Sequence, residues 1–184
     1  MSWTRRRLLR AGGILAGVSA AGVLARSAYA LEPDSRSKRI SLLNLHTAEK
    51  IDLEFFRDHN YVPESLVAIR VCLRDYRNGE QHVIDPKLMD YLYDVAQHIG
   101  VDPAFSVISG YRSPQTNEQL RERSNGVARH SLHLEGRAID VRLAGVDCAD
   151  LAAHAREMSR GGVGYYQKSD FVHLDTGAFR TWNG

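Results

Sequence analysis

The sequence has 184 residues, 43% hydrophobic and 25% charged, with a formal net charge of +2. This composition fits one globular domain and excludes collagen-like, coiled-coil and disordered chains. The first thirty residues contain five arginines and no acid, so removing those five charges from +2 leaves −3 for the rest. A mildly acidic domain is not expected to bind nucleic acid.

The N-terminal residues have the pattern of an export signal. Arg5 and Arg6 precede two leucines, as in twin-arginine signals, and an apolar stretch at 11–25 leads to the small-x-small site Ala28-Tyr29-Ala30. The alternative is a membrane anchor, but this stretch is short for a span of about 20 residues. We expect a signal peptide, a flexible leader and one domain at residues 1–30, 31–39 and 40–184.

The first elements expected after the leader are two strands and a helix. Alternating apolar residues predict strands at 40–46 and 51–56, joined by a turn at 47–50. After Pro63, apolar residues recur at helical spacing, which predicts a helix.

Capping residues mark the next elements. Asp85 and Pro86 predict a helix start and Gly100 its end. The short apolar segment 105–109 predicts a buried strand, and Ser113-Pro114 precedes a helix expected at 115–123. A polar, glycine-containing loop is expected from Ser124 to Gly136.

The C-terminal third predicts more strands around one helix. Residues 138–143 alternate cleanly, Asp147 to Asp150 can cap a helix running to about Ser159, and strands are expected at 161–166 and 171–175. Helices and strands do not alternate regularly, so the predicted class is α+β: a small, mostly antiparallel sheet with helices packed on one side.

The sequence has two cysteines, Cys72 and Cys148. Export to an oxidising compartment would permit a disulfide between them. Cys72 lies in an apolar helical pattern, so a buried free thiol is equally compatible with the sequence.

Three residues form a candidate metal site: His133 in the polar loop, Asp140 on the 138–143 strand, and His173 on the last strand. Zinc hydrolases need about three imidazole or carboxylate ligands. Strand alternation turns Asp140 away from Ile139 and Val141, and an unpaired carboxylate in an apolar strand would be costly. Three such residues also occur together by chance.

Four segments share an ordered pattern with a known family. Ser131 to Asp140 reads S-x-H-x-x-G-x-A-x-D, and Ser109 to Ser113 reads S-G-Y-R-S. The segments 162–166 and 171–177 follow. Together they resemble the D-Ala-D-Ala metallopeptidase group, which shares a zinc fold with lysostaphin and hedgehog domains. Thr116-Asn117 makes the similarity closest to murein endopeptidases of the K type, over about residues 40–182.

The resemblance implies one zinc ion per chain in a cleft on the sheet, with His133, Asp140 and His173 as ligands. It implies that Arg112 binds substrate and supports the oxyanion, a role suited to a planar guanidinium. Ser131 is expected to hydrogen-bond to substrate or to a ligand.

The general base is open between two acids. Asp170 lies three residues before the last histidine, where related enzymes often carry an acid or a histidine. Asp175 lies on the same strand face as His173, and can act as the base or orient a ligand. We favour Asp170. His130 is either a proton donor or a loop residue.

Three aromatic residues, Tyr165, Tyr166 and Trp182, either line the cleft or pack in the fold. The expected activity is zinc-dependent hydrolysis of peptidoglycan cross-link or stem peptides in the periplasm. The alternatives are a D-Ala-D-Ala carboxypeptidase or dipeptidase, and a wall-binding module without activity. We expect a monomer that meets the membrane only during export.

Overall fold

The computed structural model describes residues 37–123 and 127–184. The expected signal peptide and residues 31–36 of the expected leader lie outside the described residues. The first strand begins at Ser37, three residues before the expected start at Ile40. Within the described part of the chain, no helix is both long and apolar enough to cross a membrane.

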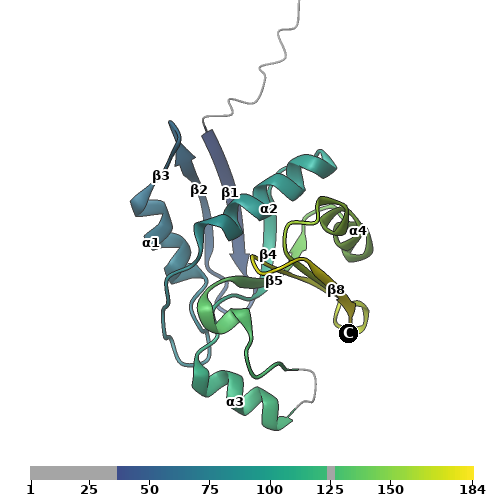
Figure 1. Ribbon diagram of the computed structural model, residues 1–184. Coiled ribbons are helices and arrows are strands. Elements are labelled where there is room, and N and C mark those ends of the chain that lie inside the picture. Colours follow the sequence, from purple (N-terminus) through teal and green to yellow (C-terminus); the bar gives the residue numbers. More distant parts are fainter. Residues whose placement is uncertain (1–36, 124–126) are drawn as a thin grey trace, which may run out of the picture. The chain divides into compact units, whose positions relative to one another are not determined.

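The domain contains one sheet of eight strands in the order β3-β2-β1-β4-β5-β7-β6-β8 (Figure 1). The strands are β1 Ser37–Asn44, β2 Lys50–Arg57, β3 Asn60–Tyr61, β4 Ala104–Ser109, β5 Ala138–Leu143, β6 Gly162–Tyr166, β7 Phe171–Asp175 and β8 Arg180–Asn183. The helices are α1 Pro63–Cys72, α2 Pro86–Ile99, α3 Pro114–Arg123 and α4 Cys148–Met158, with short 3-10 helices η1 Leu132–Glu135 and η2 Gln167–Ser169.

The sheet is mixed, so the prediction of a mostly antiparallel sheet is wrong, although the α+β class is confirmed. β1 pairs with β4 in parallel, and β6 pairs with β8 in parallel. The chain leaves β1 through β2, β3, α1 and α2 before it reaches β4, and such a long connection allows parallel pairing. The short strands β3 and β8 were not predicted from the pattern.

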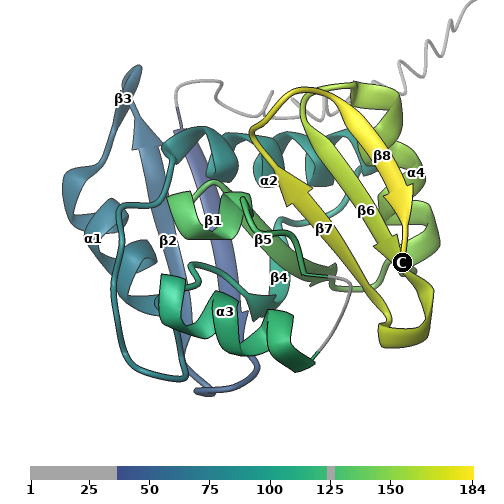
Figure 2. The ribbon, with the colours of Figure 1, turned by 60° about the horizontal axis from the view of Figure 1, so that its bottom comes forward.

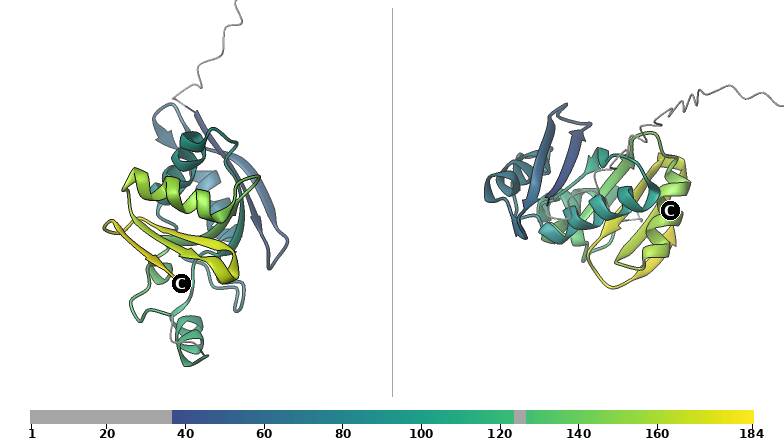
Figure 3. Two further views of the ribbon diagram at one scale, coloured as in Figure 1. Left: turned by 90° about the vertical axis from the view of Figure 1, so that its right-hand side faces the viewer. Right: turned by 90° about the horizontal axis from the view of Figure 1, so that it is seen from above.

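Three helices, α1, α2 and α4, cover one face of the sheet, while α3 and η1 lie on the other side (Figure 2). Figure 3 shows α2 and α4 next to each other across the covered face. The apolar core fills this layer with side chains such as Ile139, Val141, Leu92 and Leu151. Each fully buried side chain of this size stabilises the fold by about 1.5–3 kcal/mol.

Local signals set the helix boundaries as expected at several places. Asp85 accepts a hydrogen bond from the backbone N–H of Lys87 at the start of α2, and Gly100 ends that helix with φ of 85°. α3 begins at Pro114, one residue before the expected start. The expected loop before β5 contains η1.

Both cysteines are free thiols in this structure, which decides the alternative that the sequence left open. Cys72 and Cys148 are buried, and burial raises the pKa of each thiol to about 11. Both are therefore protonated and unreactive at neutral pH.

The alternation of β5 and β7 separates the core from the site. Ile139 and Val141 face the helices, so Asp140 faces the opposite side. Asp140 pairs directly with His173 of β7. Two adjacent strands thus place a carboxylate and an imidazole side by side on the face that the three helices leave open.

Candidate metal centre

The donor atoms of His133, Asp140 and His173 lie close together in the folded chain. His173 Nδ1 is 2.9 Å from Asp140 Oδ1, and His133 Nε2 is 3.3 Å from the same oxygen. The two imidazole nitrogens are 3.2 Å apart. All three residues are buried, although they were widely separated in the sequence.

His133 is held by the short helix η1 and by the backbone of the Gly110 loop. Its Nδ1–H donates a 2.6 Å hydrogen bond to the carbonyl of Gly110, which leaves Nε2 directed at Asp140. Ser131 caps η1, because its hydroxyl oxygen accepts from the backbone N–H of His133. Gly136 ends η1 with φ of 64°, and a Cβ there would lie 2.1 Å from the carbonyl oxygen of Val83.

Asp175 orients His173. The Nε2 of His173 is 3.0 Å from Asp175 Oδ2, so Nδ1 faces Asp140. Asp175 is fully buried and also accepts hydrogen bonds from the backbone N–H groups of Gly162 and Gly177 and from Arg180. With this many donors, its carboxylate is fixed in place.

The pKa values of the three candidate ligands follow from this packing. Burial lowers the pKa of His133. Burial also opposes the charged form of His173, but hydrogen bonds to Asp140 and Asp175 outweigh it and raise its pKa to about 9. Burial opposes the charged form of Asp140 as well, but His133 and His173 hold its pKa well below the usual range.

The donor set fits a small divalent cation such as Zn²⁺. Tetrahedral zinc with bonds of about 2.0–2.2 Å separates its ligand atoms by roughly 3.3–3.5 Å. The three donor separations, 2.9, 3.2 and 3.3 Å, are close to this range. The second nitrogen of each histidine has its own acceptor, the arrangement usual for metal-binding imidazoles.

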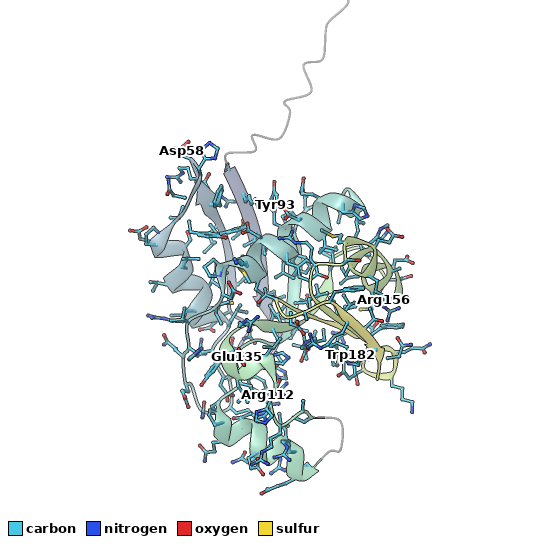
Figure 4. All side chains as sticks on the ribbon, in the orientation of Figure 1. Asp58, Tyr93, Arg112, Glu135, Arg156 and Trp182 are labelled. Atoms are coloured by element: carbon cyan, nitrogen blue, oxygen red, sulfur yellow. The ribbon has the colours of Figure 1, made fainter. Side chains whose placement is uncertain are left out.

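A cavity of about 360 Å³ opens over these residues. Besides the three candidate ligands, its lining includes Arg112, His130, Ser131, Tyr166, Phe171, Arg180 and Trp182. In Figure 4, Arg112 lies near η1 and α3, and Trp182 lies on β8. The cavity is therefore bounded by the loop before β5 on one side and by the C-terminal strands on the other.

Arg112 is a mostly buried cation next to the candidate ligands, with 11% of its side chain exposed. Its NH2 is 3.8 Å from Asp140 Oδ2, and its NH1 donates to Asn117 Oδ1 at 3.4 Å. Within residues 37–123 and 127–184, its buried Nε has no hydrogen-bond partner. Burial lowers the pKa of Arg112, while the charge of Asp140 opposes that shift. A buried donor without an acceptor costs free energy of folding. This guanidinium is therefore suited to bind a ligand that supplies the acceptor.

Asp170 lies away from the three donor atoms. Its carboxylate is 68% exposed and pairs with Arg142 at 3.2 Å, and the residue does not line the cavity. Its neighbours Ser169 and Phe171 do line the cavity. Asp170 is therefore at the rim, whereas Asp175 is enclosed behind His173.

With this geometry established, comparison with known proteins places the chain. A family model described as "Peptidoglycan L,D-endopeptidase MepK" matches residues 32–182. The chain belongs to this family.

Individual members of the MepK family align over almost the whole chain. The peptidoglycan L,D-endopeptidase MepK of Escherichia coli K12 is 42% identical over 178 residues, covering 97% of this chain and 96% of the relative. The Shigella flexneri protein of the same name gives the same values. A probable peptidoglycan L,D-endopeptidase MepK from Haemophilus influenzae is 37% identical over 181 residues, covering 98% and 96%.

Some residues of this MepK-family site were predicted and others were not. His130, Tyr166 and Trp182 line the cavity, whereas Tyr165 packs against the core. Arg180 was missed because it lies on the unpredicted strand β8. Phe171 was predicted only as a strand residue, yet it stacks on Tyr166 with ring centroids 4.5 Å apart.

Proposed function

We propose that the chain is a zinc-dependent peptidoglycan L,D-endopeptidase, which hydrolyses amide bonds between L- and D-configured centres in the peptides of the cell wall. Membership of the MepK family supports the peptidoglycan endopeptidase activity. The convergence of His133, Asp140 and His173 beside an open cavity is the observation that carries the metal-dependent chemistry.

His133 Nε2, Asp140 Oδ1 and His173 Nδ1 are the proposed ligands of one zinc ion. A zinc ion at this position would supply Lewis-acid polarisation of the scissile carbonyl and activation of a water molecule. Gly110 and Asp175 support the ligands by accepting from the other ring nitrogens. The cavity side of the three donors is where a peptide can approach.

Arg112 is proposed to bind the scissile carbonyl or a neighbouring carboxylate. Its Nε has no acceptor in the described chain, and its NH2 lies next to Asp140. A permanently charged guanidinium stabilises negative charge that develops on the carbonyl oxygen. Ser131 also lines the cavity, and we propose that its hydroxyl hydrogen bonds to substrate.

Asp170 is proposed as the general base. Asp175 is fully buried, and its two oxygens already accept five hydrogen bonds from four residues, so a water proton cannot reach it. The carboxylate of Asp170 is exposed, and its sequence neighbours Ser169 and Phe171 line the cavity. In this proposal it leaves Arg142 when substrate binds, takes the water proton and returns it to the leaving amine.

Digestion of purified peptidoglycan tests the function. The native protein should convert cross-linked muropeptide dimers to monomers, a chelator should stop the reaction, and added zinc should restore it. Replacing His133 by Ala should abolish cleavage and remove the zinc ion bound at this centre. Shortening of stem peptides without loss of dimers would indicate a carboxypeptidase. Binding to the wall without any cleavage would indicate a binding module.

Export to the periplasm is proposed on two grounds. The wall lies outside the cytoplasmic membrane, and residues 1–30 have the pattern of a twin-arginine signal. Mass spectrometry of periplasmic protein should find a mature N-terminus near Leu31. We also expect the mature protein to be a monomer. An intact Met1 on membrane-bound protein would show an anchor instead.

A further inference from the structure

A second group of metal-binding side chains lies on the helical face of the domain, away from the proposed catalytic centre. His98 is in the last turn of α2, and His154 and Glu157 are one turn apart on α4. These two helices pack against each other on the face of the sheet opposite Asp140 and His173 (Figure 1). The group is therefore separate from the catalytic cavity.

The spacing of the donor atoms suits a transition metal. Glu157 Oε2 lies 3.3 Å from His98 Nε2 and 3.5 Å from His154 Nδ1. All three donor atoms lie within 4.8 Å of one another. Tetrahedral zinc places its ligand atoms roughly 3.3–3.5 Å apart, and both separations from Glu157 Oε2 match that range.

The surroundings of His154 point to a missing partner. Its Nδ1 is buried, and among the described residues it has no hydrogen-bond partner, because the contact to Glu157 does not have hydrogen-bond geometry. A buried imidazole nitrogen without a partner is costly. The imidazole of His98, with its ring centroid 5.4 Å away, is oriented edge-on to it.

Two neighbouring charged side chains have partners elsewhere in the described part of the chain. Arg156, next to Glu157 in sequence, donates instead to Asn183 near the end of β8. Asp94, one turn before His98 on α2, is paired with Arg160 and Lys38. Glu157 is therefore the carboxylate that remains for the two histidines.

We propose that His98, His154 and Glu157 form a second zinc site, which joins α2 to α4. Two imidazoles and one carboxylate are a common zinc ligand set, and the exposed Glu157 leaves a fourth position for water. An ion bound there joins the two helices that back the strands carrying Asp140 and His173. It stabilises the folded state because it binds that state only.

Metal counting on variants tests this site separately from the catalytic one. After metal removal and dialysis against Zn²⁺, the native protein should bind two zinc ions per chain. His133→Ala should retain one ion, and H98Q/E157Q should also retain one. Adding H98Q/E157Q to His133→Ala should leave none, and His59→Gln, which changes an exposed histidine elsewhere, should still bind two.

Thermal unfolding gives a second measurement. In the His133→Ala background, saturating zinc should raise the melting temperature by roughly 5 °C, and H98Q/E157Q should remove that rise. Circular dichroism of each metal-free variant checks that it is folded. An unchanged zinc count in H98Q/E157Q relative to the native protein, or no zinc bound to His133→Ala, would overturn the proposal.

Discussion

Asp175 fixes the orientation of the His173 ring. Asp175 Oδ2 lies 3.0 Å from His173 Nε2, so the other ring nitrogen, Nδ1, faces Asp140. The same carboxylate accepts from two backbone N–H groups and from Arg180. This one acid therefore connects the candidate metal ligands to the last strand of the sheet. A Cβ at Gly162 would lie 2.2 Å from Asp175 Oδ2, so the close approach of β6 requires glycine.

The first prediction concerns this contact. Asp175→Asn should weaken zinc binding by roughly 10–100-fold, because an amide orients the imidazole less well and is a poorer acceptor. Competition with a chelator measures the affinity. Excess zinc should restore part of the lost activity, and a variant that holds zinc as tightly as the native protein would contradict the positioning role.

The second prediction separates Asp170 from Asp175. Asp170→Asn should keep its full zinc content and lose roughly 10²–10⁴ in turnover, because it removes the proposed base and no ligand. Zinc content and turnover should be measured on the same sample, and added zinc should not restore the turnover. Near-native turnover would exclude Asp170 as the base and leave His130, which also lines the cavity.

A third prediction tests the guanidinium. Arg112→Lys keeps the positive charge but loses the planar donor fork, so turnover should fall by roughly 10²–10³ with zinc content unchanged. Arg121→Lys on α3 is the matched control, since Arg121 pairs with the exposed Glu118 and does not line the cavity. Equal turnover in both variants would show that Arg112 does not contact the reacting carbonyl.

The fourth prediction concerns pH and the buried acid Asp75. Burial opposes ionisation of Asp75, but hydrogen bonds from Thr116, Ser113 and Arg77 outweigh this and lower its pKa from 3.8. The resulting stability is present above the unfolded-state pKa and is lost as the pH falls through the lower folded-state pKa.

Asp75→Asn should therefore lower the free energy of unfolding at pH 7 by about 1–3 kcal/mol. The variant should also lose less stability than the native protein as the pH falls. Denaturant unfolding between pH 7 and pH 3 measures both effects. Asp52→Asn, at an exposed ion pair with Arg39, should change stability by less than about 1 kcal/mol. If the stability of Asp75→Asn falls with pH as steeply as that of the native protein, Asp75 is not the source of this pH dependence.

Several features of this protein could be derived from the sequence because their causes are local. Asp85 and Gly100 bound α2 through contacts within a few residues. The alternation of residues 138–143 told which side of β5 faces the core, and hence that Asp140 faces the open side. The candidate ligands followed from strand alternation together with the motif around His133.

The tertiary structure alone decided the order and direction of the strands. The parallel pairing of β1 with β4 and of β6 with β8 joins segments separated by other elements, and no local pattern specifies such neighbours. For the same reason β8, and with it the contact of Arg180 to Asp175, was not predicted.

Local sequence also does not determine the surroundings of the two acids near His173, Asp170 and Asp175. Strand alternation placed Asp175 on the face of His173, and spacing pointed to Asp170, so the sequence left both open as the base. Burial separates them: Asp175 is enclosed by β6 and Arg180, while Asp170 stays exposed beside Arg142. Solvent access depends on every segment that packs nearby, so only the folded chain determines which carboxylate a water molecule can reach.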